Sequence, residues 1–206
     1  MDLNDTPEQA QYRVQARAWL DANRAEAPPR QGSYEDTAYV DARRTWQRRL
    51  AEAGLAAVTW PVEFGGRGLG PAEQVIVNQE ISRAQVPGIL DVIGIGMLGP
   101  CLIAHGSEEQ KSRHLGPMLH GDEVWCQLFS EPGAGSDLAA VQTRARPVDG
   151  SADGRGSGNG SGSGNGSGAA GWKLSGQKVW TTNAQFASFG LLLARTDPDV
   201  PKHKGL

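Results

Sequence analysis

The sequence predicts an α+β fold, in which a helical N-terminal domain precedes a domain of strands and turns. Helix-capping residues and prolines at first-turn positions recur up to about residue 120. From Val124 onward, β-forming residues and glycine-rich turns replace them. A chain of 206 residues can form two small domains with a sizeable core. We therefore expect a helical domain over residues 1–121 and a β domain over residues 122–206.

Two helices are expected before residue 55. Asp5-Thr6-Pro7-Glu8 combines a capping side chain, a proline and an early carboxylate, which is typical of a helix start, and Pro28-Pro29 ends that helix. A second helix follows Ser33 and stops at Gly54, a residue type that often terminates helices. Residues 55–60 are then predicted to be extended.

Three further helices are expected before the strands begin. Pro71 opens the first of them, which runs through about Gln85. Residues 87–105 are apolar with internal glycines and predict a buried helix. Ser107-x-x-Gln110 is a capping box, which predicts a last helix ending near His120.

Residues 94–99 match the pattern Gly-x-Gly-x-x-Gly, which is typical of dinucleotide-binding folds. Pro100 interrupts the helix that would face the phosphates, and the chain around it is predicted to be helical rather than a strand-turn-helix unit. We therefore reject a dinucleotide site here. The glycines are expected to allow the close approach of a helix or of a bulky ligand.

The most informative segment is residues 130–137, Ser-Glu-Pro-Gly-Ala-Gly-Ser-Asp, which directly follow a strand-like apolar run. They predict a tight turn at the end of a strand. Gly133 and Gly135 allow backbone N–H groups to approach a ligand closely. Glu131 and Asp137 are expected to hold the turn by accepting hydrogen bonds from backbone N–H groups, rather than to act as an acid–base pair.

A second informative segment is residues 176–183, Gly-Gln-Lys-Val-Trp-Thr-Thr-Asn. It opens on a glycine turn and continues as a strand-like run of β-formers. Trp180 offers a large aromatic face beside the hydroxyls of Thr181 and Thr182. This combination suits a planar ring system with hydrogen-bonding edges.

Residues 150–168 are almost entirely Gly, Ser and Asn, a composition typical of flexible coil. Strands are expected on either side, at residues 142–146 and 172–174, and the family resemblance given below implies that they pair with each other. We therefore interpret this stretch as an expanded hairpin loop without a function, rather than as an interdomain linker.

Together, residues 130–137 and 176–183 resemble the flavin-binding middle domain of the acyl-CoA dehydrogenase family. The resemblance continues in residues 55–70 and 105–111, which look like the family's N-terminal domain, and in residues 194–198, which look like its middle domain. It implies the family's fold in truncated form, with an N-terminal helical domain followed by a β-barrel-like middle domain.

The resemblance also implies roles for individual residues around bound FAD. The backbone near Gln127, Phe129 and Ser130 would hydrogen-bond the pyrimidine edge of the flavin. Family members often have an aromatic residue at the position of Gln127 and a threonine at the position of Ser130. Trp180 would stack on the ring system and Thr182 would bond its N5 atom. Ser136 is the expected substrate contact. The full set of implied cofactor-binding residues is Gln127, Phe129, Ser130, Gly135, Ser136, Trp180, Thr181 and Thr182.

The activity implied by the resemblance is the FAD-dependent introduction of an α,β double bond into an acyl-CoA thioester. An electron-transfer flavoprotein or similar acceptor would be the partner, and the full-length protein would be a homo- or hetero-tetramer. The family's C-terminal bundle, which carries the catalytic glutamate, has no counterpart before Leu206, so the chain is expected to be an inactive fragment. We name no catalytic residue, since neither Glu80 nor Glu131 matches that glutamate by position.

Two alternatives stay open at this point. An acyl-CoA oxidase or flavin monooxygenase on the same fold would carry the same motifs. A non-catalytic subunit that binds flavin or a CoA ester within a hetero-oligomer would do so as well. The sequence does not identify the acyl group, which we expect to come from fatty acid or steroid metabolism.

Composition excludes several other classes of protein. A net charge of −3 gives no basic surface for nucleic acid. No apolar run approaches the about 20 residues that span a membrane, and the polar start shows no signal peptide, so we expect a cytoplasmic protein. Cys101 and Cys126 are expected to be reduced core thiols, and the four histidines form no metal-like set.

Overall fold

The computed structural model describes residues 4–148 and 171–206, which form two compact units. The first, here called the helical unit, comprises the chain up to Trp125 together with Gln185–Phe189. The second, the strand unit, comprises Cys126–Ala184 and Gly190–Leu206. The predicted loop over residues 150–168 lies outside the described residues, and the predicted domain boundary near Gly121 stays a prediction.

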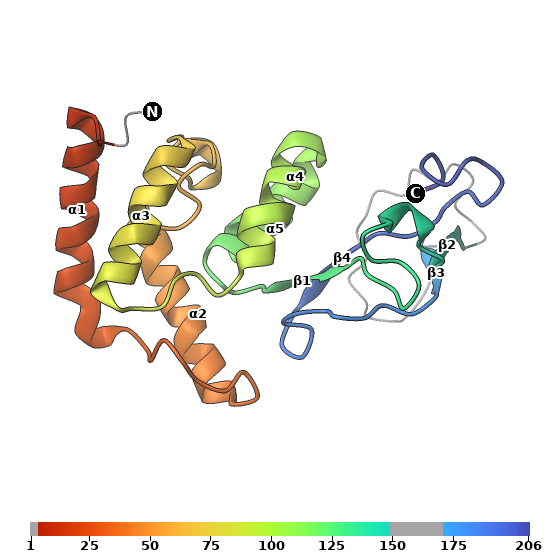
Figure 1. Ribbon diagram of the computed structural model, residues 1–206, viewed down its shortest axis with the longest axis horizontal. Coiled ribbons are helices and arrows are strands. Elements are labelled where there is room, and N and C mark those ends of the chain that lie inside the picture. The colour runs from red at the N-terminus through yellow and green to blue at the C-terminus, as the bar shows by residue number, and fades with distance from the viewer. Residues whose placement is uncertain (1–3, 149–170) are drawn as a thin grey trace. The chain divides into compact units, whose positions relative to one another are not determined.

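The helical unit contains five α-helices among the described residues (Figure 1), and capping side chains mark the starts of three of them. Ser107 closes a capping box, as predicted, and Thr6, which lies in the predicted helix start, closes another. The second helix starts later than expected after Ser33, because Asp36 Oδ1 accepts the Ala38 N–H at 2.9 Å and caps it there. The helices are α1 (Pro7–Asn23), α2 (Thr37–Glu52), α3 (Pro71–Ala84), α4 (Gly99–His105) and α5 (Glu108–Leu119), with 3-10 turns at Arg24–Glu26 and Val62–Phe64 and a π-helix at Gly94–Leu98.

Glu80 of α3 is a buried carboxylate that joins α3 to α1, and the two helices lie side by side in Figure 1. Arg17 Nε and Arg83 Nε donate to Glu80 Oε2 at 2.9 and 2.7 Å, and Arg13 Nη1 donates to Oε1 at 3.2 Å. The hydrogen bonds from Arg17 above all, then Arg83 and Arg13, outweigh burial and lower the pKa of Glu80 to about 2. Glu80 therefore has a structural role.

Two buried side chains of α2 hold the segment that leads into the π-helix. Trp46 Nε1 donates to Pro87 O at 2.7 Å, and Gln47 Oε1 accepts the N–H groups of Leu90 and Asp91 at 2.9 and 2.8 Å. Because Gln47 binds these N–H groups, the chain is not helical there. The predicted helix over residues 87–105 is therefore wrong in its first part, and helical backbone begins only at Val92.

Residues 55–60 form turns, so the extended conformation predicted for them is wrong. Leu55 and Ala56 donate their N–H groups to Leu50 O, and Trp60 N–H donates to Ala57 O at 2.9 Å. Ala57 takes a φ of 48°, in the left-handed region. These local bonds replace a strand ladder and bury Trp60, which is 2% exposed.

The glycines of the π-helix region differ in how closely they are packed. A Cβ added to Gly99 would lie 1.9 Å from Trp60 Cζ2, whereas one added to Gly96 would meet nothing within 4 Å. We expect Gly99→Ala to lower the free energy of unfolding by about 2 kcal/mol through overpacking. Gly96→Ala should be neutral or stabilise by up to about 1 kcal/mol. Denaturant unfolding of both variants checks this, and equal effects would contradict it.

Asp91 is a fully buried carboxyl that should make the stability of the protein depend on pH. Its Oδ1 accepts the N–H groups of Gly94 and Trp125 at 2.8 and 3.2 Å, while Oδ2 has no partner among the described residues. Burial raises the pKa of Asp91 from 3.8 to about 6. The folded state thus binds this proton more tightly than the unfolded state does, so stability falls as pH rises from about 4 to about 6.

The expected loss across that pH range is about 3 kcal/mol. Asp91→Asn removes the titrating group, so melting curves of the variant should change less between pH 4.5 and pH 7 than those of the natural chain. Parallel pH profiles of the two proteins would show that Asp91 does not titrate in this range.

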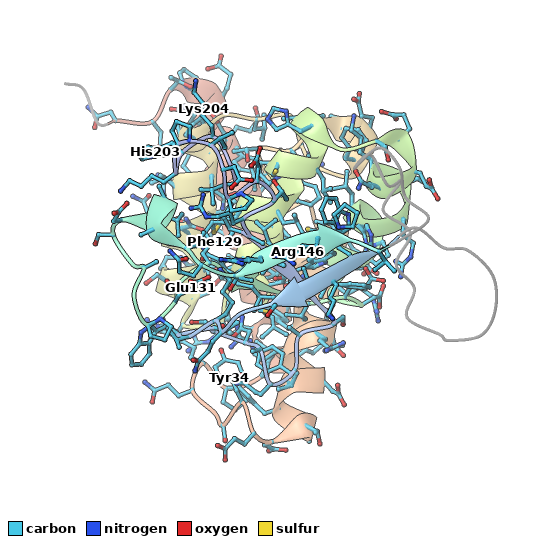
Figure 2. The ribbon with its side chains drawn as sticks, turned by 90° about the vertical axis from the view of Figure 1, so that its right-hand side faces the viewer. Tyr34, Phe129, Glu131, Arg146, His203 and Lys204 are labelled. Atoms are coloured by element: carbon cyan, nitrogen blue, oxygen red, sulfur yellow. The ribbon has the colours of Figure 1, made fainter. Side chains whose placement is uncertain are left out.

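A late segment, Gln185–Phe189, belongs to the helical unit. Phe186 packs against the buried cluster of Val40, Leu90 and Val124. Its ring stacks on Tyr34, labelled in Figure 2, with centroids 5.6 Å apart. Its carbonyl accepts a hydrogen bond from Arg44 at 3.2 Å. A partly buried residue from late in the chain therefore packs on the core of the helical unit.

The described strands form two two-stranded sheets: β1 (Trp125–Leu128) pairs with β4 (Phe189–Leu192), and β2 (Arg144–Pro147) pairs with β3 (Trp172–Ser175). The β2–β3 pair is antiparallel with Ala145 opposite Leu174, as predicted for the flanks of residues 150–168. The β-barrel-like middle domain is not seen among the described residues. Four strands of four residues cannot close a barrel, which needs about eight strands.

The two cysteines differ in exposure. Cys126 is buried, as predicted, but Cys101 is exposed, so its prediction as a core thiol is wrong. α4 is a short helix, and Cys101 lies on a part of its surface that faces solvent. Over residues 4–148 and 171–206, no helix combines the length and apolar character needed to cross a membrane.

Candidate flavin site

The turn over residues 130–137 is closed by its own backbone. Glu131 N–H donates to Ala134 O at 2.9 Å, and Ala134 N–H donates to Glu131 O at 3.1 Å. Pro132 and Gly133 occupy the two central positions, where proline presets the first backbone angle. The predicted tight turn is therefore present directly after β1.

The side chain of Glu131 holds this turn against the chain that follows it. Its carboxylate, beside Phe129 in Figure 2, is buried and accepts the N–H groups of Gln142 and Thr143 at 2.6 and 2.9 Å and the ammonium group of Lys178 at 2.9 Å. Burial alone would raise the pKa of Glu131, but the donors on Thr143, Gln142 and Lys178 outweigh burial and lower it to about 2. The structural role predicted for Glu131 agrees with this geometry.

Lys178 brings the two informative segments together. Its side chain is 9% exposed, and its ammonium group donates to Phe129 O at 2.9 Å as well as to Glu131. The neighbouring Val179 N–H donates to Ser130 O at 2.9 Å. Lys178 has no predicted role, because its partners Phe129 and Glu131 precede it by 49 and 47 residues and no local pattern links them.

Trp180 is the most exposed large apolar side chain among the described residues, with 90% of its surface accessible. Its φ of 59° lies in the left-handed region, and Thr182 N–H donates to Trp180 O at 3.1 Å. The strand predicted after Gly176 is therefore wrong, since the chain turns at Trp180. At this turn the indole of Trp180 points away from the core, so its ring faces are accessible to a ligand.

The other predicted site residues lie in or next to the two informative segments, residues 130–137 and 176–183. Gln127, Phe129 and Ser130 are half-buried at and just after the end of β1, and Thr181 is half-buried next to the exposed Thr182. Gly135 and Ser136 are exposed. A Cβ added to Gly133 or Gly135 would meet nothing within 4 Å, so there is room over this backbone.

This set of groups fits a flavin cofactor. An open indole face suits the ring system, hydroxyls at Ser130 and Thr182 suit its polar edges, and uncovered glycine backbone suits a phosphate. The structure thus places most of the predicted cofactor residues on two segments that Glu131 and Lys178 join. It does not test the individual roles, which stay predictions.

Arg195 supports the far end of the turn. Its guanidinium group is buried and donates to Ala139 O at 2.7 Å, to Val141 O at 3.3 Å and to Lys202 O at 3.3 Å. Lys202 in turn pairs with the exposed Asp137 at 2.7 Å. Asp137 therefore bonds a surface lysine rather than the backbone of the turn, contrary to the role predicted for it.

Comparison with known proteins decides the family. The family model described as "Acyl-CoA dehydrogenase, N-terminal domain" matches residues 6–122. The chain belongs to the acyl-CoA dehydrogenase family. This match lies in the helical part of the chain, whereas the candidate flavin site follows it.

Similarity to individual family members extends over the candidate site. The chain is 39% identical to acyl-CoA dehydrogenase IpdE1 of Mycolicibacterium smegmatis over 201 residues, which are 95% of this chain and 48% of that protein. It is 45% identical to acyl-CoA dehydrogenase FadE34 of Mycobacterium tuberculosis over 160 residues, 78% of this chain and 19% of that protein. The chain thus spans at most about half the length of these family members.

Solved family structures show the same fold. The structure described as the Tcur3481-Tcur3483 steroid ACAD matches the whole chain with a TM-score of 0.70 and 29% identity, over 47% of its own length. The ChsE4-ChsE5 complex of Mycobacterium tuberculosis matches with a TM-score of 0.71 and 26% identity, over 46% of its length. Both descriptions name two components.

Proposed function

We propose that this chain is the flavin-binding part of an acyl-CoA dehydrogenase that introduces an α,β double bond into an acyl-CoA thioester. The observation that carries the proposal is the Glu131–Lys178 ion pair, which joins the two informative segments while Trp180 stays 90% exposed. Through Lys178 the ion pair connects residues 176–183 to the turn at residues 130–137. A ligand that covered the indole of Trp180 would displace no contact within the fold, because the side chain is exposed. Family membership and the similarity to acyl-CoA dehydrogenases across the site support it.

Bound FAD would supply the acceptor for the hydride that leaves Cβ of the thioester. In the proposed arrangement, the backbone near Gln127 and Phe129 donates to the pyrimidine edge, and Trp180 stacks on the ring system. Thr182 donates to N5, and Ser136 contacts the substrate. A glutaryl-CoA dehydrogenase structure with the same fold, at a TM-score of 0.58, was determined with FADH2.

The proton on Cα of the thioester requires a base that neither buried glutamate provides. Glu80 is engaged by three arginines and Glu131 by Lys178 and two amides, and the pKa of each is lowered to about 2. Such carboxylates are poor proton acceptors near neutral pH. We therefore propose that the base lies in the part of the family members' length that this chain does not span.

A second candidate is a subunit of a hetero-oligomer in which another chain completes the site. The observation that favours it is that both solved structures above are described by two components, one of them as a steroid ACAD. The substrate would then be a fatty or steroid acyl-CoA, and an electron-transfer flavoprotein or similar acceptor would take the electrons.

The test is anaerobic titration of the natural protein, purified with any co-purifying subunit and loaded with FAD, with a panel of acyl-CoA thioesters. Bleaching of the flavin absorbance supports a dehydrogenase, and slow reoxidation by air separates it from an oxidase. Bound flavin that no thioester bleaches, in a complex whose other subunit is active, would support the non-catalytic subunit. A protein that neither binds FAD nor responds to any thioester would refute the proposal.

A further inference from the structure

The peptide group between Phe129 and Ser130 has a buried cation on its carbonyl side. Lys178 Nζ donates to Phe129 O at 2.9 Å, and the side chain of Lys178 is 9% exposed. A hydrogen bond from an ionised donor is about twice as strong as one between neutral groups. Lys178 thus does more than link the two informative segments, because it also places a positive charge against a backbone carbonyl directly after β1.

The N–H on the other side of the same peptide group has no partner among the described residues. It belongs to Ser130, which is half-buried and donates its N–H to no described residue. Since a trans peptide group is planar, its C=O and N–H point in opposite directions, so this N–H points away from Lys178. The next carbonyl, Ser130 O, accepts the Val179 N–H at 2.9 Å. The unused donor is therefore held in a fixed orientation from both sides.

Glu131, beside Phe129 in Figure 2, balances the charge of Lys178 without reaching the same peptide group. Its carboxylate accepts from Lys178 Nζ at 2.9 Å and from the N–H groups of Gln142 and Thr143 at 2.6 and 2.9 Å. Burial alone would raise the pKa of Glu131, but these donors lower it to about 2, so the carboxylate stays ionised. Seen from a distance, the two opposite charges nearly cancel. Any influence of Lys178 on a ligand therefore passes mainly through the carbonyl that it contacts.

A cation on a carbonyl oxygen strengthens the N–H of the same peptide group as a donor. The ammonium group draws electron density toward the oxygen, which leaves the N–H hydrogen more positive, and hydrogen bonds in series strengthen one another in this way. Burial preserves the effect, because little solvent screens the charge of Lys178. Such a donor discriminates between two forms of a ligand that differ in negative charge at the atom it contacts.

From these features we propose that Lys178 is a positioning residue for the flavin, which makes the Ser130 N–H a strong donor to the pyrimidine edge and thereby raises the reduction potential of the cofactor. The inference rests on the proposed function, since it requires flavin at this site. Negative charge collects at the pyrimidine edge when flavin is reduced, so a stronger donor binds the reduced form more tightly than the oxidised form. A purely structural lysine would change the affinity for both forms equally and leave the potential unchanged.

The first test measures the reduction potential of bound FAD in the natural full-length protein, with any subunit that co-purifies, by equilibration with a dye of known potential. Lys178→Met keeps an unbranched side chain but removes the charge. We expect the preference for reduced over oxidised flavin to fall about tenfold, which lowers the potential of a two-electron couple by about 30 mV.

Lys202→Met is the matched control for this measurement. Lys202 also pairs with a carboxylate of residues 130–137, Asp137, but its side chain is half exposed, so solvent screens its charge. Its replacement should leave the potential unchanged. An unchanged potential in Lys178→Met, or equal shifts in the two variants, would overturn the role of Lys178.

The second test separates the polarised peptide group from the bare charge of Glu131. Lys178→Met leaves this carboxylate unpaired, and its field alone would lower the potential. The double variant Lys178→Met/Glu131→Gln removes both charges, and its potential should still be lower than that of the natural protein. Recovery of the natural potential in the double variant would show that only the unpaired carboxylate acts, and would overturn the inference.

Glu131→Gln alone decides the question if variants without Lys178 fail to fold. It keeps the ammonium group on Phe129 O and removes the balancing charge, so the potential should rise above that of the natural protein. An unchanged or lowered potential in this variant would overturn the inference.

Titration of the same proteins with acyl-CoA thioesters separates this inference from the proposed function. Bound FAD that no thioester reduces, together with a lowered potential in Lys178→Met, would overturn the dehydrogenase and keep the role of Lys178. Reduction by a thioester, with no shift of the potential in Lys178→Met, would keep the function and overturn the inference. A natural protein that binds no FAD would overturn both.

Discussion

Replacing Glu131 by alanine should lower the free energy of unfolding of the strand unit by about 3 kcal/mol. The variant leaves the ammonium group of Lys178 buried with only Phe129 O as partner, and it frees the amides of Gln142 and Thr143. Hydrogen exchange at these two amides, together with denaturant unfolding, measures the loss. Since the pKa of Glu131 is lowered from 4.5 to about 2, this stabilisation should disappear as pH falls through that range.

Asp137→Ala is the matched control for this prediction. Asp137 lies in the same turn and also pairs with a lysine, but both side chains are at least half exposed. Exposed pairs of this kind contribute less than about 1 kcal/mol. If both variants unfold alike, the buried pair does not hold the turn.

Trp180→Ala should weaken FAD binding by about tenfold or more while leaving the melting temperature of the flavin-free protein unchanged. The indole is 90% exposed, so its removal costs the fold no buried contact. Stacking of a planar heterocycle on an aromatic side chain contributes about 1–3 kcal/mol. Flavin affinity is measured by fluorescence titration of the apoprotein in its natural full-length form.

Trp172→Ala provides the comparison for Trp180. Trp172 lies on β3 in the same unit and is 39% exposed, but it lies outside both informative segments. Its replacement should leave the flavin affinity unchanged. Unaltered flavin binding in Trp180→Ala, or equal losses in the two variants, would contradict the assignment of Trp180.

Features that depend on neighbouring residues in the chain were predicted well. Thr6 and Ser107 each exchange hydrogen bonds with a glutamine three residues later in the chain. That spacing is visible in the sequence. The turn at residues 130–137 likewise follows from local composition, whereas the pairing of β2 with β3 was implied by the family resemblance. Most residues proposed for the flavin site lie in residues 130–137 and 176–183, and the family resemblance of these two segments is what identifies them.

Features that depend on distant partners were missed. The bend at residues 87–91 exists because Gln47, far earlier in the chain, takes two of its backbone N–H groups. The turn at Trp180 follows the bonds of Lys178 and Val179 to the segment around Ser130, and β-propensity alone suggested a strand. No local pattern signals such contacts.

The return of Gln185–Phe189 to the helical unit has a consequence for the order in which the protein can mature on the ribosome. The cluster of Val40, Leu90 and Val124 is complete only when Phe186 covers it. The N-terminal helices leave the ribosome first. Their apolar cluster stays exposed until the chain has been translated as far as Phe186. Nascent chains that stop before Phe186 therefore expose an apolar surface of the kind that chaperones bind. A shortened chain that ends near the predicted boundary at Gly121 would lack Phe186 and would expose the same surface in its final form.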